Sequence, residues 1–209
     1  MSANRLLILG AVRIFQPVHG YFVRRELMSW HADAWANLNP GSIYNALRTL
    51  TREGFLEEVG TEAHGGRPAR TSYQLTAEGE TEFVTLLRSA LWERNEHAPA
   101  NLLAAWSFAW VLTREEVIAA LDHRVEQIAA HGKSVEFAID HLKRTGDPPE
   151  QVAENLRLIQ SRLDGEATWA RNLAARLRAG DYWFDGEPNP PWPIRPVIAG
   201  PASPATPEG

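Results

Sequence analysis

The stretch Pro40-Gly-Ser-Ile-Tyr-Asn-Ala-Leu-Arg-Thr-Leu-Thr-Arg-Glu-Gly54 decides the fold, because it reads as one short amphipathic helix with a signal at each end. Asn39 is a favourable N-cap residue and Pro40 suits the first helical position. Gly54 can adopt the left-handed conformation that ends a helix. The apolar positions recur at i, i+4 and i+7, which predicts one buried stripe: Ile43, Leu47 and Leu50.

The opposite side of this helix carries hydrogen-bonding groups and two cations but no acid. A helix of this composition can read the edges of DNA bases, or it can simply be a soluble surface helix. The choice between the two therefore depends on the neighbouring elements. The outward residues are Ser42, Asn45, Arg48, Thr49 and Arg52, with Tyr44 on the flank.

Two helices are predicted before this stretch. Residues 4–15 carry apolar side chains at helical spacing and end before Pro17. Residues 20–30 form the second helix, and a polar and aromatic connection over residues 31–38 leads to the third.

Beyond Gly54 the apolar period changes from 3.6 to about two. Residues 55–59 and 71–75 predict the two strands of a hairpin, and the loop between them is rich in turn formers. Thr76 is a predicted N-cap for a further helix that extends to about Arg94.

The order helix, helix, helix, hairpin, helix predicts a winged helix-turn-helix domain. In such a domain the third helix enters the major groove of DNA, and the hairpin contacts the neighbouring backbone or minor groove. Arg67 and Arg70 lie in the hairpin loop, next to the flexible pair Gly65-Gly66. Long cations on a flexible backbone suit contacts with phosphates.

Five segments, in the right order and spacing over residues 4–90, resemble the PadR family of transcriptional regulators. The resemblance implies a dimeric, repressor-type winged helix whose C-terminal helices supply most of the dimer contact. It also implies that phenolic acids or drug-like aromatics are sensed in some members. The segments are His19-Gly20-Tyr21, residues 40–47, Leu50 with residues 53–56, Gly66-Arg67-Pro68 and residues 73–79.

The second half predicts two long helices with heptad repeats. Residues 113–116 form a capping box that begins the first helix, and Asp147-Pro-Pro-Glu150 begins the second. Apolar side chains recur every seven residues in both helices, with Glu166 as an interruption. The pattern predicts an antiparallel pair. We expect this pair to pack against a second subunit, because Trp169 has no predicted partner in its own chain; the alternative is a purely intramolecular hairpin.

The fold class is therefore mainly α with a small β-hairpin, divided into three regions. Residues 1–94 form the winged-helix DNA-binding domain and residues 95–185 a helical dimerisation and effector domain. Residues 186–209 form a tail with eight of the fourteen prolines. This tail is predicted to be extended and mobile, and the alternative is a docking role on the dimer or on a partner.

Composition excludes several classes of site. The chain of 209 residues has no cysteine, so it has neither a disulfide framework nor a cysteine nucleophile. The histidines lack the i, i+4 spacing of a helical metal site, and no catalytic motif appears. No apolar run is long enough to span a membrane. We expect a cytoplasmic protein that is no enzyme, with no metal and no cofactor.

Charge leaves one rival function open. The net charge is −5, while residues 1–92 hold nine arginines and nine acids and so balance. A neutral domain binds DNA if its cations gather on one face. The alternative reading is a winged-helix protein-interaction module without specific DNA readout.

The predicted DNA contacts follow from the winged-helix geometry. Ser42, Asn45 and Arg48 are predicted to face base edges, with Tyr44 and Arg52 toward phosphates. Arg67 and Arg70 are predicted to hold the flanking backbone or minor groove. As a homodimer, the protein would bind double-stranded DNA at a pseudo-palindromic operator, with half-sites about one helical turn or a multiple apart.

Eight tryptophans are the other unusual feature. Tryptophans in such number favour core or interface packing, but planar aromatic walls also suit a flat apolar or cationic ligand. The group between the two halves, Trp92, Trp106 and Trp110, is the predicted pocket for a small aromatic effector.

Overall fold

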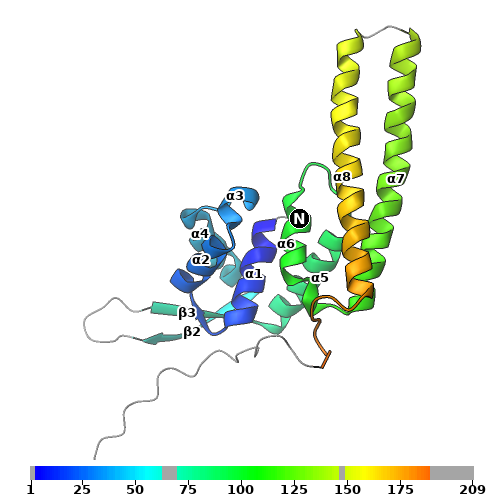
Figure 1. Ribbon diagram of the computed structural model, residues 1–209. Coiled ribbons are helices and arrows are strands. Elements are labelled where there is room, and N and C mark those ends of the chain that lie inside the picture. Colours follow the sequence, from blue (N-terminus) through cyan, green and yellow to red (C-terminus); the bar gives the residue numbers. More distant parts are fainter. Residues whose placement is uncertain (1–2, 63–69, 146–148, 189–209) are drawn as a thin grey trace, which may run out of the picture.

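The computed structural model describes residues 3–62, 70–145 and 149–188. Figure 1 shows a helical body from which a two-stranded wing and a long helical hairpin project in different directions. The body holds α1 (Ala3–Phe15), β1 (Val18–His19), α2 (Gly20–Ser29), α3 (Ala32–Ala36), α4 (Pro40–Arg52), β2 (Leu56–Glu62), β3 (Arg70–Leu75), α5 (Ala77–Trp92), α6 (Ala100–Phe108) and η1 (Ala109–Val111). The hairpin holds α7 (Arg114–Thr145), η2 (Glu150–Val152) and α8 (Ala153–Arg178). The predicted fold class, mainly helical with a winged helix-turn-helix and an antiparallel helix pair, is confirmed.

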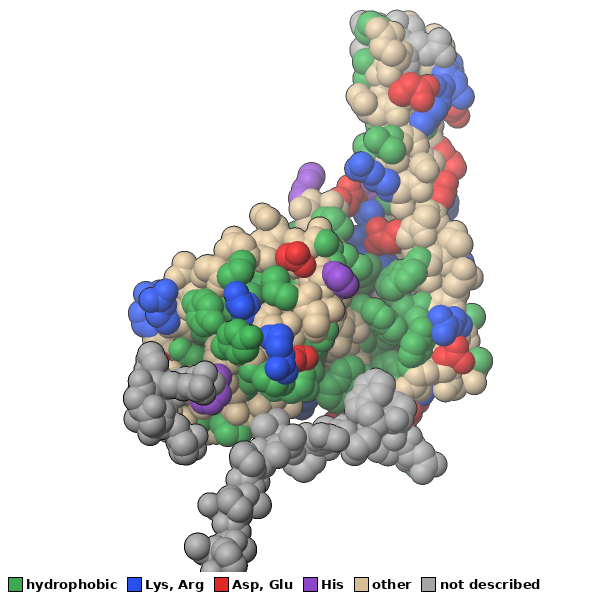
Figure 2. Space-filling view, turned by 60° about the vertical axis from the view of Figure 1, so that its left-hand side comes forward, with side chains coloured by type: hydrophobic (Ala, Val, Ile, Leu, Met, Phe, Trp, Pro, Cys, Tyr) green, Lys and Arg blue, Asp and Glu red, His purple; other side chains and the backbone are tan. Residues whose placement is uncertain are grey.

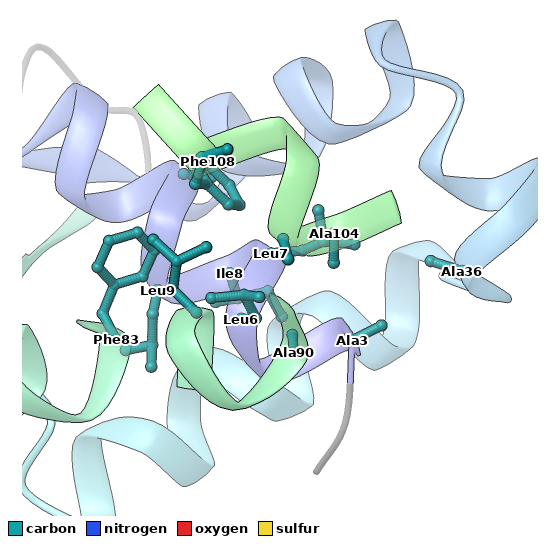
Figure 3. Close-up of a cluster of buried hydrophobic side chains, with 14 of the residues drawn as sticks. Ala3, Leu6, Leu7, Ile8, Leu9, Ala36, Phe83, Ala90, Ala104 and Phe108 are labelled. Atoms are coloured by element: carbon teal, nitrogen blue, oxygen red, sulfur yellow. The ribbon is translucent and has the colours of Figure 1, made fainter. Parts of the chain in front are cut away.

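Helix α1 lies at the centre of the body. Its residues Leu6 to Leu9 are fully buried in succession, so every side of the helix meets other elements. Helices α5 and α6 pack against it through Phe83 and Phe108, whose rings meet edge to face at 5.5 Å (Figure 3). Gly10 allows α6 to pack closely against α1, because a Cβ atom at this position would lie 2.3 Å from the Phe108 ring.

Helix α4 forms where the sequence predicts it. The Asn39 side chain accepts from the Ser42 backbone N–H at 2.9 Å, and the Asn39 N–H donates to the Ser42 hydroxyl at 3.0 Å, so the two residues close a capping box. Gly54 has a φ of 81°, the left-handed conformation expected after the last turn. The stripe of Ile43, Leu47 and Leu50 is buried in the core, which confirms the predicted inner face.

Two short elements of the body escape the sequence pattern. Helix α3 lies in the polar and aromatic connection over residues 31–38, for which no helix was predicted. Left-handed residues bound it at His31 (φ 54°) and Asn37 (φ 52°). Five residues are too few to show a helical period. Strand β1 has two residues, and it makes the predicted hairpin into a three-stranded antiparallel sheet of order β1-β3-β2.

Helices α7 and α8 pack antiparallel over most of their length (Figure 1). Their base joins the main core of the body. Farther out, a separate cluster of four buried side chains holds them together: Ile128, Val135, Leu163 and Ala167.

The second helix begins later than the sequence predicts. Of the predicted cap, Asp147 and Pro148 lie outside the described residues. The chain then makes a 3-10 turn, in which the Val152 N–H donates to the Pro149 carbonyl at 2.9 Å. Helix α8 starts only at Ala153 and has no side-chain cap, because this tighter turn precedes it.

After α8 the chain folds back on the base of the hairpin. We call residues 181–187 the C-terminal strap. The Asp185 N–H donates to the Trp110 carbonyl at 2.8 Å, and the Arg114 guanidinium binds the Glu187 carboxylate at 2.6 and 2.7 Å. Phe184 is buried under this guanidinium. The chain is thus held as far as Glu187, the second residue of the predicted tail; residues 189–209 lie outside those described.

Candidate nucleic-acid interface and domain junction

The side chains of α4 that are predicted to contact DNA differ in their exposure to solvent. Tyr44, Asn45, Arg48 and Arg52 are exposed. Ser42 is half-buried, and its hydroxyl is engaged in the capping box, where it also donates to the Asn39 carbonyl at 2.7 Å. The hydroxyl of Ser42 therefore stabilises the start of the helix, and the four exposed side chains form its accessible surface.

Arg48 and Asn45 act as a pair on this face. The Arg48 guanidinium donates to the Asn45 side-chain oxygen at 2.8 Å, across one turn of the helix. This contact holds the guanidinium above the helix and leaves its other N–H groups available to external acceptors. Such a fork matches the two acceptors of a guanine edge.

A groove runs on both sides of Tyr44, between α4 and the sheet. One cavity of about 480 Å³ is lined by His19, Gly20, Tyr21, Tyr44, Thr71 and Tyr73. A second of about 530 Å³ is lined by Gly41, Tyr44, Asn45, Arg48 and Tyr73. A Cβ atom at Gly20 would lie 3.0 Å from the Tyr44 ring, so the glycine allows α2 and α4 to approach closely.

Tyr73 and His19 are site residues that the sequence reasoning did not select. Burial raises the pKa of Tyr73 above its ordinary value, the negative charge of Glu58 adds to the rise, and Arg48 opposes it. The phenol is therefore a protonated donor at neutral pH. The His19 ring meets the Ser72 hydroxyl at 3.0 Å. Both residues lie in the family-like motifs, but only the sheet pairing brings them to α4.

The wing is described in part. Arg67 lies outside the described residues. Arg70 pairs through its backbone with Glu62 at the outer end of the hairpin, and its side chain is not among those described. Of the acids on the wing, Glu57 accepts from the Gln74 amide at 2.6 Å. Arg70 was placed in the hairpin loop from the sequence, whereas β3 already begins at Arg70.

A second site lies where the body meets the hairpin, and its centre is Arg124 of α7. Arg124 is only 3% exposed. One end of its guanidinium donates to the Glu166 carboxylate of α8 at 2.8 Å. The other end faces the last carbonyls of α5, with distances of 3.3 Å to both Ala90 and Leu91. A single buried cation thus joins three helices.

Arg94 extends this network into the connection between α5 and α6. Its guanidinium binds Glu96 at 2.7 Å and Glu166 at 3.4 Å, and Glu96 also lies 2.6 Å from the His131 ring. The Nε atoms of Arg94 and Arg124 are buried without a hydrogen-bond partner. Glu166, which interrupts the heptad row in the sequence, is therefore the shared acceptor of two arginines.

A cavity of about 740 Å³ opens beside this network. Its walls include three acids and three arginines: Glu93, Glu96, Glu166, Arg94, Arg124 and Arg162. They also include the apolar side chains of Leu102, Leu103, Ile159 and Leu163. A wall that combines charged and apolar side chains suits a small amphipathic ligand.

The three tryptophans predicted as an effector pocket have different neighbours. The Trp92 ring lies 5.8 Å from His123 of α7, and the Trp110 ring lies 6.1 Å from Trp183 of the C-terminal strap. Trp106 contacts Trp169 and Tyr182. None of the three lines the 740 Å³ cavity, although Trp106 belongs to α6, which supplies two of the cavity's apolar side chains.

Residues 8–85, which run from α1 to α5 and include all of α4 and the sheet, match the model of the transcriptional regulator PadR-like family. This region of the chain is PadR-like. This confirms the resemblance drawn from the sequence, and with it the DNA-binding regulator class. Since PadR-like proteins are transcriptional regulators, the prediction that the chain is no enzyme is also confirmed.

Solved structures to which the chain is similar include PadR proteins. Bacillus subtilis PadR in complex with operator DNA is 20% identical with a TM-score of 0.38, over 85% of this chain and 98% of that chain. The protein smu.1604c from Streptococcus mutans UA159 is 18% identical with a TM-score of 0.37, over 86% and 98%. Bacillus subtilis PadR in complex with p-coumaric acid is 17% identical with a TM-score of 0.35, over 84% and 99%. No curated protein matches the chain.

Among the described residues, no helix combines the length and the apolar character needed to cross a lipid bilayer.

Proposed function

We propose that this PadR-like protein is a homodimeric repressor that lays α4 of each subunit in a major groove of its operator. The observation that carries the proposal is the outward face of α4, where Asn45 and Arg48 are exposed and bonded to each other beside a groove. Asn45 and Arg48 read base edges, with Ser42 at the start of the helix. Tyr44 and Arg52 contact phosphates, and Arg67 and Arg70 of the wing hold the flanking DNA.

The dimer is proposed from the surface of the α7–α8 hairpin. Phe137 of α7 is 69% exposed and Leu158 of α8 is 53% exposed, on a hairpin whose outer half has a small interior cluster. A two-helix hairpin buries one face of each helix, and a second copy would cover apolar side chains that remain outside. In this division residues 1–94 bind DNA, residues 95–185 dimerise and take the effector, and residues 186–209 form a tail.

The effector is proposed to be a small aromatic acid that enters the 740 Å³ cavity. Its ring would lie against Leu102 and Ile159, and its carboxylate would accept from the unpartnered Nε groups of Arg94 and Arg124. A ligand that draws these arginines away from Glu166 would shift α5 relative to the hairpin, and with it the spacing of the two reading helices. Trp106 and Trp110 lie on α6 and η1, and Trp92 ends α5, so their emission reports this movement.

Selection of bound sequences from random duplex DNA tests the proposal. We expect a pseudo-palindrome whose half-sites are about one helical turn, roughly 10 bp, or a multiple apart. Affinity should fall steeply with salt, because phosphate contacts release counterions. Light scattering at micromolar concentration should give the mass of two chains.

Three outcomes would count against parts of the proposal. A monomeric mass would remove the dimer. Salt-insensitive capture of a protein, with no enriched DNA sequence, would favour the protein-interaction module. Quenching of tryptophan emission by an aromatic acid without loss of DNA binding would separate the ligand from regulation.

A further inference from the structure

Tyr73 of β3 is a buried tyrosine whose hydroxyl opens on the groove beside Tyr44. The residue is only 9% exposed. Within the described residues its hydroxyl has no hydrogen-bond partner, yet the oxygen is not sealed in the core. Tyr73 lines the cavities on both sides of Tyr44, so this end of the side chain faces their space. A buried phenol normally has a partner, and an open donor in a cavity therefore indicates a ligand.

The surroundings of this hydroxyl keep it a neutral donor. Tyr73 stands opposite Glu58 of β2 in the sheet, and Arg48 of α4 lines the same cavity as Tyr73. Burial raises the pKa of Tyr73, Glu58 raises it further and Arg48 lowers it. The proton therefore stays on the phenol at neutral pH, and the hydroxyl can donate to an anion that Arg48 attracts.

The first turn of α2 lies in the wall of the 480 Å³ cavity, through Gly20 and Tyr21. No side chain caps this turn. His19, the residue in the N-cap position, instead directs its Nδ1 atom to the Ser72 hydroxyl at 3.0 Å. The first N–H groups of a helix have no carbonyl partner within the helix, and they carry partial positive charge. This turn therefore adds anion-binding donors to the hydroxyl of Tyr73.

Cations lie near both kinds of donor. The Arg24 guanidinium lies 5.3 Å from the centre of the Tyr21 ring, and within the described residues no acid pairs with it. Arg48 borders the second cavity together with Tyr73. Figure 2 shows cationic and hydrophobic side chains side by side over the body, with fewer acids among them. A surface that combines cations with neutral donors suits the phosphate backbone of DNA.

We propose that this groove binds one phosphate of the DNA backbone, with the Tyr73 hydroxyl and the first N–H groups of α2 as its donors. The inference rests on the proposed function and adds to it a contact made by neutral groups. A phosphodiester presents acceptor oxygens only, which match a site that has donors on two walls. Because α4 borders the same groove, the contact fixes how deeply α4 enters the major groove, and it positions Arg48 at the base edges.

Tyr73→Phe removes the donor and keeps the ring. DNA affinity should fall about tenfold on the selected operator and on unrelated duplex alike, because a hydrogen bond to a charged group is lost. The slope of affinity against salt should stay unchanged, since a neutral hydroxyl releases no counterion. Fluorescence anisotropy measures both quantities, and the midpoint of thermal unfolding should match the wild type. The matched control, Tyr182→Phe, removes a hydroxyl in the C-terminal strap and should bind DNA as the wild type does.

Neutral methylphosphonates, placed at one operator phosphate at a time, locate the contact. At one position in each half-site the wild type should lose about tenfold in affinity and Tyr73→Phe about twofold or less, because both changes remove the same hydrogen bond. Equal losses at every position in the two proteins would overturn this inference and leave the proposed function standing. A wild type that binds no duplex DNA would overturn both.

Discussion

The body and the outer half of the α7–α8 hairpin are built in different ways. In the body, α1 is buried from Leu6 to Leu9 and a continuous core reaches from α2 to the base of the hairpin. The outer hairpin depends on four buried side chains and leaves Phe137 and Leu158 in solvent. The body thus determines its own packing. The hairpin fixes the pairing of two helices and presents a surface that its own chain does not complete.

The joint between these regions is polar as well as apolar. Arg124 lies between the end of α5 and Glu166 of α8, and Arg94 shares the same carboxylate. Apolar contacts tolerate small slides, whereas hydrogen bonds to fixed carbonyls and a carboxylate hold one geometry. A polar joint therefore suits a connection between a rigid body and an arm.

Of the predicted changes, the loss of this polar joint should have the largest effect, a decrease in the free energy of unfolding. Arg124→Met removes the buried cation and leaves Glu166, whose side chain is 27% exposed, without its principal partner. Loss of one member of a buried pair costs about 3–5 kcal/mol, and the partial exposure of Glu166 places the expected loss near about 3 kcal/mol. Urea unfolding measures it. The double variant with Glu166→Met should recover part of the loss. A double variant whose loss equals the sum of the losses of Arg124→Met and Glu166→Met would show that the pair is not coupled.

The second prediction separates recognition from stability within the body. Arg48→Ala should cost about 1–3 kcal/mol in binding to the selected operator and relax preference at one base position, while the midpoint of unfolding stays unchanged. Arg70→Ala should weaken all DNA sequences alike and lower the salt slope by about one. Fluorescence anisotropy over a range of salt measures both. Arg171→Ala, an exposed arginine of α8, is the control and should match the wild type.

A smaller effect is expected at the start of α4. Asn39→Ala removes the side-chain acceptor of the capping box and should cost about 1 kcal/mol of stability. Thermal unfolding measures the change. Asn45→Ala lies on the same helix without a capping role, so it should change DNA binding and leave stability within about 0.5 kcal/mol. If both variants destabilise the protein equally, the cap is not what fixes the reading helix.

The smallest expected effect is a loss of the contact between Arg114 and the C-terminal strap at acid pH. The Arg114 guanidinium hydrogen-bonds the Glu187 carboxylate and holds its pKa below the ordinary glutamate value, with help from the Phe184 N–H and against a smaller effect of burial. A lowered pKa in the folded state stabilises the contact above the unfolded pKa, and this is lost as pH falls through the folded pKa. The emission of Trp183, which donates to the Glu187 carbonyl, should change in that acid range. Glu187→Gln should abolish the step; a step that persists belongs to another group.

Much of the body was predictable because its signals are local. The cap at Asn39, the stripe of Ile43 and Leu47 and the left-handed Gly54 each depend on residues a few positions apart. The change of period after Gly54 predicted the hairpin for the same reason. Helix α3 and strand β1 were missed, because two to five residues are too short for a period and need partners from elsewhere in the chain.

The sequence by itself determined the order of the longer helices and the hairpin, the inner face of α4 and the PadR-like character of residues 8–85, since caps, periods and motifs act over short distances along the chain. Only the tertiary structure decided that Arg124 and Glu166, 42 residues apart, share one buried contact, and that Tyr73 and His19 lie beside the reading helix. It also showed that Trp92, Trp106 and Trp110 each contact different residues. The physical reason is that a side chain's partner across the fold depends on how whole helices pack, which no spacing along the chain records.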